Sequence, residues 1–204
     1  MTPTGRGALL IFPDLVRRAK KGDRIALAEL LDAHAAQAYR LALHILRNQA
    51  DAEDAVQNAS IKAFTNLGRF DELRPFAPWF LRIVTREALN LRRAEMTRFA
   101  FWRRQVKDEI SEELVEQVIQ VKADHRDLWR AVNRLKANDR IVLTLSYFME
   151  MSEGEVAQIL GIKRGAVKKR KHTALVRLRA VVVREFPGLG DTLQGQQQPK
   201  GSSP

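Results

Sequence analysis

The chain has 204 residues, of which 35 are Lys or Arg and 24 are Asp or Glu, and its formal net charge is +11 at pH 7. This basic excess favours a polyanionic partner. There are no cysteines, which excludes disulfides, thiolate metal sites and cysteine nucleophiles, and fits a reducing, cytoplasmic environment. No apolar run approaches membrane-spanning length and no N-terminal apolar core marks a signal peptide, so we expect no membrane insertion.

The first half of the chain has helical periodicity. Apolar residues recur at three- and four-residue steps from 25 to 46, which predicts a helix there. Further helices are predicted over about 51–67 and 79–94. The segment 68–78 between them is rich in glycine, proline and aromatic residues, and this composition predicts a loop. Strand-like alternation is absent, so the predicted fold class is all-α.

The helix predicted over 51–67 has a polar face opposite its apolar stripe, which consists of Val56, Ala59, Ala63 and Leu67. Asp54, Gln57, Asn58 and Ile61 share that face when residues are counted at 100° each. The simpler interpretation is a solvated outer face. An isoleucine beside Gln57 and carboxylates instead favours a small docking surface for another protein.

Composition divides the chain into two helical units. The sequence predicts one domain over 1–96 and a second over 124–186. The linker between them, 97–123, concentrates acidic residues in an otherwise basic protein. Apolar residues at helical spacing in that linker fit a surface helix equally well. Residues 187–204 are rich in Gly, Gln, Pro and Ser, which predicts a disordered tail.

Residues 152–170 predict a helix-turn-helix with a basic second helix. Ser152 and Glu155 have capping-box spacing, and Gly161 supplies the turn. With Val167 and Ala174 buried, the basic residues of the second helix are left to meet DNA. We expect major-groove contacts from Arg164, Lys168, Lys169 and His172, and phosphate contacts from Lys163, Arg170 and Arg177.

These segments resemble those of a known family, the extracytoplasmic-function (ECF) sigma factors. Residues 22–27, the run Asp-Ala-Glu-Asp-Ala-Val-Gln at 51–57 and the run Trp-Phe-Leu-Arg-Ile at 79–83, ahead of Arg92 and Arg93, resemble region 2 of that family. Residues 135–178, with the helix-turn-helix, resemble region 4. The resemblance extends from about residue 14 to residue 184, in order and with normal spacing.

The resemblance implies two partners, bacterial core RNA polymerase and promoter DNA, and family habit adds an anti-sigma factor. It implies that residues 1–96 dock on the polymerase β′ clamp helices and recognise and melt the −10 element, and that 124–186 recognise the −35 element. It implies that the acidic linker threads the polymerase channel. The polymerase-binding residues are then Asp51, Glu53, Asp54, Gln57, Asn58 and Ile61. The −10 residues are Arg69, Phe70, Phe76, Trp79, Arg82, Arg86, Asn90, Arg92 and Arg93, whose aromatic rings and arginines suit extruded bases and the strand backbone. For Phe76 and Trp79, core packing is an equally good interpretation.

Several positions depart from the family pattern. Lys171 falls in the buried stripe of the second helix, where leucine is usual; we expect its stem to lie along the core with its ammonium reaching out, and the helix to pack loosely there. Other departures are Asn58, Arg86, Asn90, Ala166 and Leu175. They leave the promoter sequence open.

Two other classes of protein remain as alternatives. A conventional helix-turn-helix regulator, with an N-terminal dimerisation or sensing domain, would bind duplex DNA without polymerase. A nucleic-acid enzyme fits poorly, because the four histidines are scattered and the acidic cluster at 51–54 lacks a second set of ligands. We therefore expect no catalytic residue, no metal, no cofactor and no small-molecule substrate.

Overall fold

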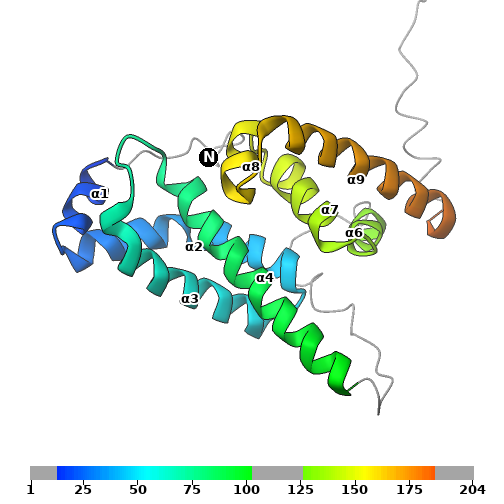
Figure 1. The fold of residues 1–204 in the computed structure, drawn as a ribbon, viewed down its shortest axis with the longest axis horizontal. Helices are drawn as coiled ribbons and strands as arrows, with labels where there is room; N and C mark the ends of the chain where they lie inside the picture. Colours follow the sequence, from blue (N-terminus) through cyan, green and yellow to red (C-terminus); the bar gives the residue numbers. More distant parts are fainter. Residues whose placement is uncertain (1–12, 103–125, 187–204) are drawn as a thin grey trace, which may run out of the picture.

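The computed structural model describes residues 13–102 and 126–186 (Figure 1), and within them the regular structure is helical, as predicted. Residues 97–102 of the predicted linker belong to α4 (Phe76–Trp102), so the predicted helix end at about 94 is too early. The rest of the predicted linker, with its predicted helix, and the predicted tail lie outside the described residues. The first unit comprises α1 (Pro13–Lys20), α2 (Arg24–Leu46), α3 (Gln49–Asn66), η1 (Leu67–Arg69) and α4 (Phe76–Trp102). The second comprises α6 (Arg126–Asn133), α7 (Ala137–Leu143), η3 (Thr144–Phe148), α8 (Glu153–Leu160) and α9 (Arg164–Glu185).

Local capping determines where α2 and α3 begin. The Asp23 carboxylate accepts hydrogen bonds from the Ile25 and Ala26 amides, both at 3.0 Å. The Asn48 side chain accepts from the Asp51 amide at 3.0 Å. These contacts satisfy amide groups that the first turn of a helix leaves without partners.

The first unit is a bundle in which α2, α3 and α4 pack on one another and α1 packs on α2 (Figure 1). The face that α3 buries is made of alanines, Ala52, Ala55, Ala59 and Ala63, all fully buried. Small side chains allow the neighbouring helices to approach closely. The predicted apolar stripe is therefore shifted slightly, since Val56 is only half-buried.

The predicted loop over 68–78 is too long. Helix α4 begins at Phe76, so the last three residues of that prediction are helical. Pro78 contributed to the loop prediction. Proline is, however, tolerated in the first turn of a helix, where its missing N–H has no intrahelical partner to lose.

The second unit packs α7 and α8 against α9, and its apolar core is continuous with that of the first unit. Val156, Ile159, Val167 and Ala174 are buried, as the helix-turn-helix prediction requires. Helix α8 lies against α4, and α7 lies against α2. Along residues 13–102 and 126–186, no helix has the length and apolar character needed to cross a membrane.

Candidate nucleic-acid and polymerase interfaces

The helix-turn-helix is built from local contacts. The Glu155 amide donates to Ser152 Oγ at 3.3 Å, and the Ser152 amide donates to Glu155 Oε2 at 2.7 Å, so the predicted capping box is confirmed. Gly161 ends α8 with φ of 65°, a conformation that favours glycine. The Ile162 amide returns to the Ala157 carbonyl at 3.1 Å and closes the turn.

The basic face of α9 is open to solvent. All the residues expected to contact the −35 element are exposed: Lys163, Arg164, Lys168, Lys169, Arg170, His172 and Arg177. Two of them have acidic partners: Arg164 Nε lies near Glu153, and Arg177 Nη1 donates to Oδ2 of the buried Asp139 at 2.6 Å. Arg177 therefore neutralises a buried carboxylate of α7 in addition to its predicted phosphate contact.

Lys171 joins α9 to α8. Its Nζ lies 2.9 Å from Glu153 Oε1, while Arg164 Nε lies 3.8 Å from Glu153 Oε2. The hydrogen bond between Lys171 and Glu153 lowers the pKa of Glu153 and raises the pKa of Lys171. The ammonium reaches out of the stripe as expected. In place of the leucine contact there is an ion pair between the two helices.

The predicted polymerase-docking face of α3 is exposed. Glu53, Asp54, Gln57 and Asn58 are exposed, Ile61 is 58% exposed, and Asp51 is half-buried. Phe64, which the sequence analysis did not select, is 54% exposed three residues beyond Ile61. The i, i+3 spacing places the two side chains on neighbouring positions of one helix face. The spacing of Phe64 from Ile61 could therefore have identified Phe64 from the sequence.

The residues expected to act at the −10 element differ in exposure. Arg69, Arg86, Asn90 and Arg93 are exposed, Trp79, Arg82 and Arg92 are half-buried, and Phe70 and Phe76 are buried. The three rings form one cluster, with centroids 5.7 Å apart for Phe70 and Phe76, 4.9 Å for Phe70 and Trp79, and 5.4 Å for Phe76 and Trp79. In this conformation Phe70 and Phe76 are core residues, and only Trp79 keeps an accessible part.

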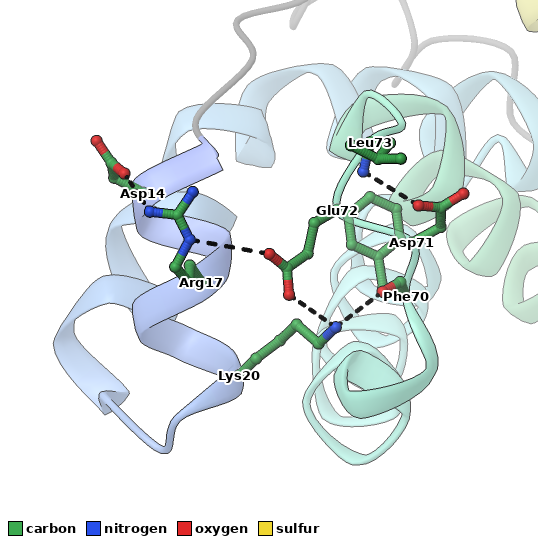
Figure 2. A network of polar contacts seen from close by, with 7 residues as sticks. All are labelled: Asp14, Arg17, Lys20, Phe70, Asp71, Glu72 and Leu73. Carbon is green, nitrogen blue, oxygen red and sulfur yellow. Dashed lines mark hydrogen bonds and ion pairs between the residues drawn. The ribbon is translucent and has the colours of Figure 1, made fainter.

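The loop between η1 and α4 is held by polar contacts from two directions (Figure 2). From inside the loop, Asp71 accepts from the Leu73 amide at 3.1 Å and from Arg74 Nε at 3.1 Å. From α1, Lys20 Nζ lies 2.9 Å from Glu72 Oε1 and donates to the Phe70 carbonyl at 3.2 Å. The loop that precedes the predicted −10 helix is therefore fixed by a helix about fifty residues earlier.

A buried arginine joins the two units. Arg140 of α7 is 2% exposed. Its Nε donates to the His44 carbonyl at 2.7 Å and its Nη2 donates to the Ile45 carbonyl at 2.9 Å. These carbonyls belong to the last turn of α2, where a helix lacks internal donors and where a cation is favoured by the helix dipole. Burial, with the nearby charges of Arg92 and Arg47, lowers the pKa of Arg140 to about 9, so it remains cationic at neutral pH.

The contacts between the two units, which include those of Arg140 with the end of α2, are called the seam below. Ring contacts extend it. The His44 ring stacks on Trp129 with centroids 4.5 Å apart and an interplanar angle of 8°. Burial, with the charges of Arg140 and Arg40, lowers the pKa of His44 to about 4. A neutral imidazole is therefore part of the seam at pH 7.

The seam also covers a predicted −10 residue. A Cβ placed on Gly161 would lie 2.9 Å from Arg82 Nη2 and 3.3 Å from its Cζ. The guanidinium of α4 thus packs directly on the turn of the helix-turn-helix. In this conformation, the helix predicted to contact the −10 element lies against the turn of the helix-turn-helix predicted to contact the −35 element.

Comparison with known families accounts for both units. Residues 30–98 match Sigma-70 region 2, and residues 125–178 match Sigma-70 region 4. Both matches follow the order in which the structure places the bundle and the helix-turn-helix. A conventional regulator with an unrelated first domain does not account for the region 2 match.

Three bacterial sigma factors are similar in sequence to this chain over most of its length. The RNA polymerase sigma factor NccH of Alcaligenes xylosoxydans xylosoxydans is 30% identical over 172 residues, 82% of this chain and 92% of that one. The ECF RNA polymerase sigma factor SigM of Mycobacterium tuberculosis is 32% identical, over 77% of each chain. SigW of Bacillus subtilis, also an ECF factor, is 28% identical over 80% of this chain and 92% of its own.

Solved structures share the fold. CnrH, in complex with the cytosolic domain of CnrY, superposes with a TM-score of 0.62 at 23% identity, over 85% of this chain and 97% of that one. RpoE from Bartonella quintana, in complex with the anti-sigma factor NepR, gives 0.61 at 21% identity, over 81% and 99%. The two matched regions and the sequence relatives show that the chain belongs to the ECF family of RNA polymerase sigma factors, which direct bacterial polymerase to promoters and initiate transcription.

Proposed function

We propose that region 2 binds core polymerase and the −10 element, that region 4 binds the −35 element, and that particular residues carry each role. The exposed face of α3, formed by Glu53, Asp54, Gln57 and Ile61, docks on the β′ clamp helices of core polymerase. Its exposure and its mixture of carboxylates with an apolar centre support this role. We add Phe64 to this surface, because it extends the apolar part by one turn.

In region 4, α9 reads the −35 element as duplex. Its exposed cations need no rearrangement to enter a major groove, since none of them is buried. Lys169 and His172 are the base-contacting candidates, whereas Lys163 at the start of the helix is better placed for phosphate. Arg177 contributes less to DNA binding, because its charge already faces Asp139.

In region 2, the exposed arginines of α4 and Arg69 follow the opened −10 strand, and Trp79 offers the accessible aromatic surface. The buried positions of Phe70 and Phe76 favour a supporting role, in which they hold Trp79 in place. Direct base stacking by those two phenylalanines would require the loop to open.

The docked arrangement of the regions must separate before both promoter elements are bound. The −10 and −35 elements are about 25 base pairs apart, which is roughly 85 Å at 3.4 Å per pair. Regions that share one core cannot span that distance, and Arg82 lies on the turn of the helix-turn-helix. We infer that the structure is a closed form and that polymerase binding favours an open one.

Further expectations follow from the family. Because RNA polymerase is its partner, we infer that the protein acts in the cytoplasm and has no catalytic activity of its own. The structure of RpoE with the anti-sigma factor NepR supports the proposal that an anti-sigma factor also binds this chain.

The docking face provides the first test. Asp54→Lys combined with Gln57→Ala should abolish co-purification with core polymerase while circular dichroism and thermal unfolding stay unchanged, because both side chains are exposed. Asp32→Lys with Gln37→Ala is the matched control, since it changes the charge equally on α2. Retained polymerase binding by the α3 variant would remove the proposed docking surface.

Trp79→Ala tests strand opening. It should leave duplex binding by region 4 intact and reduce the permanganate reactivity of promoter thymines in the holoenzyme complex. Normal opening by a folded Trp79→Ala variant would show that the ring is core packing only.

A further inference from the structure

Helix α1 lies between two other parts of region 2. Val16 and Ala19 are buried against the bundle. Arg18 Nη2 lies 2.7 Å from Asp23 Oδ2, the cap of α2. On the other side, Arg17 and Lys20 face the loop that leads into α4 (Figure 2). The helix therefore connects the start of α2 with that loop through separate cations.

Lys20 makes the stronger of the loop contacts. Its ammonium is shared between Glu72 Oε1 at 2.9 Å and the Phe70 carbonyl at 3.2 Å, and its side chain is 24% exposed. Arg17 Nε is farther from Glu72 Oε2, at 4.0 Å. A contact that holds both a backbone carbonyl and a side chain restrains the loop more than a surface ion pair between two side chains does.

The restraint acts on residues whose positions determine what the loop displays. The ring of Phe70 packs against Trp79, and Asp71 bonds the Leu73 amide and Arg74. Residues 70, 71 and 72 are thus each held by a contact. The side chain of the next residue, Leu73, is 95% exposed. The conformation of the loop is thus determined jointly by α1, by the aromatic cluster and by Asp71.

We propose that Lys20, assisted by Arg17, is a positioning residue for −10 recognition: through Glu72 and the Phe70 carbonyl it holds the loop 70–74 and the adjacent Trp79 in the geometry that engages the opened strand. This rests on the proposed function of the loop and α4. Neither Lys20 nor Glu72 contacts DNA in this account. Their effect is transmitted through the loop.

The test uses the full chain, alone and in holoenzyme. In holoenzyme, Lys20→Met should lower the rate of promoter opening about threefold to fivefold, the range of a partly exposed ion pair. Glu72→Gln should lower it less, because the hydrogen bond from Lys20 to the Phe70 carbonyl remains. The double variant should be no worse than Lys20→Met, because Lys20→Met already removes the ion pair with Glu72. Occupancy of a −35 duplex should not change.

Arg18→Met is the matched control. It removes one positive charge from the same helix, so it reproduces any general loss of attraction to DNA, but its partner is Asp23 and not the loop. Opening by Arg18→Met should equal that of the unaltered protein. Equal losses for Lys20→Met and Arg18→Met, or additive losses for Lys20→Met and Glu72→Gln, would overturn the proposal.

A measurement on the free protein separates this proposal from the proposed function. Hydrogen exchange over residues 70–74 should accelerate about fivefold in Lys20→Met and stay unchanged in Arg18→Met, with thermal unfolding nearly unaltered in both. Unchanged exchange in Lys20→Met would show that α1 does not hold the loop, whatever the loop does. Accelerated exchange together with normal opening by both Lys20→Met and Trp79→Ala would instead refute the −10 role of the loop, and the positioning role with it.

Discussion

The two surfaces that we propose read the promoter are built in opposite ways in this sigma factor. Region 4 exposes every residue proposed to contact the −35 element, on a helix that follows α8, which begins with a capping box and ends in one glycine turn. Region 2 keeps Phe70 and Phe76 buried, holds its loop from α1 and packs Arg82 against region 4. A rigid, exposed protein surface can contact the base edges of duplex DNA in the major groove. An extruded base instead needs a pocket or an aromatic ring that can receive it when the DNA strands separate.

In the proposed mechanism, region 4 must separate from region 2 but needs no internal rearrangement to dock on duplex DNA. Region 2 must lose the contact between Arg82 and Gly161 and keep the conformation of its loop. The predictions below test the seam first and the reading faces afterwards.

The largest expected effect is at the seam. Arg140→Met should weaken docking of region 4 on region 2 by about 3–5 kcal/mol, because two charged hydrogen bonds to the end of α2 are lost. Fluorescence energy transfer between labels on α3 and α9 should report a longer mean distance. Arg179→Met, an exposed substitution on α9, is the control. An unchanged distance in Arg140→Met would show that apolar packing alone closes the protein.

The next effect separates base from phosphate contacts in region 4. Lys169→Ala should cost about 1–3 kcal/mol on promoters with the preferred −35 base and relax the preference at one position. Lys163→Ala should weaken all promoters alike and lower the salt slope by roughly one unit. Filter binding or anisotropy with a −35 duplex at several salt concentrations distinguishes them. If both variants lose affinity equally on every sequence, α9 reads no base through Lys169.

Acidification should open the seam. The pKa of His44 is about 4 when docked and near 6.5 when exposed, so the open form binds more protons between these values. Docking is fully stable above about pH 6.5 and weakens as the pH falls towards 4; from pH 7 to 5 the open form gains about twentyfold, or about 2 kcal/mol. Arg140 and Arg40 are the charged groups that face His44. His44→Phe, which keeps the backbone carbonyl that Arg140 uses, should abolish most of this dependence in the same energy-transfer assay. Equal pH dependence in both proteins would assign it to other groups.

The smallest effect concerns the two helices of the helix-turn-helix. Lys171→Met should change the thermal stability by less than about 1 kcal/mol, because the lost ion pair with Glu153 is partly exposed and a thioether can fill the apolar stripe. Thermal unfolding of the full chain would measure it. A much larger loss would mean that this ion pair, and not the apolar core, holds α8 on α9.

The sequence by itself determined the local structure. Helical period identified α2, α3 and most of α4, and Ser152, Glu155 and Gly161 determined the helix-turn-helix, because capping and turn geometry depend on residues within about four positions of one another. The exposed face of α3 also followed from periodicity. Proline gave a wrong boundary at Phe76–Pro78, since the same residue suits both a loop and a first helical turn.

Only the tertiary structure decided the partners of residues that lie far apart in the chain. Nothing local indicated that Arg140 would be buried against the carbonyls of residues 44 and 45, that Lys20 would hold the loop at Phe70, or that Lys171 would pair with Glu153. Phe70 and Phe76 could equally have been exposed for stacking or packed in the core. A hydrogen bond or a buried ring requires particular three-dimensional neighbours, and the packing of the helices against one another determines which neighbours those are.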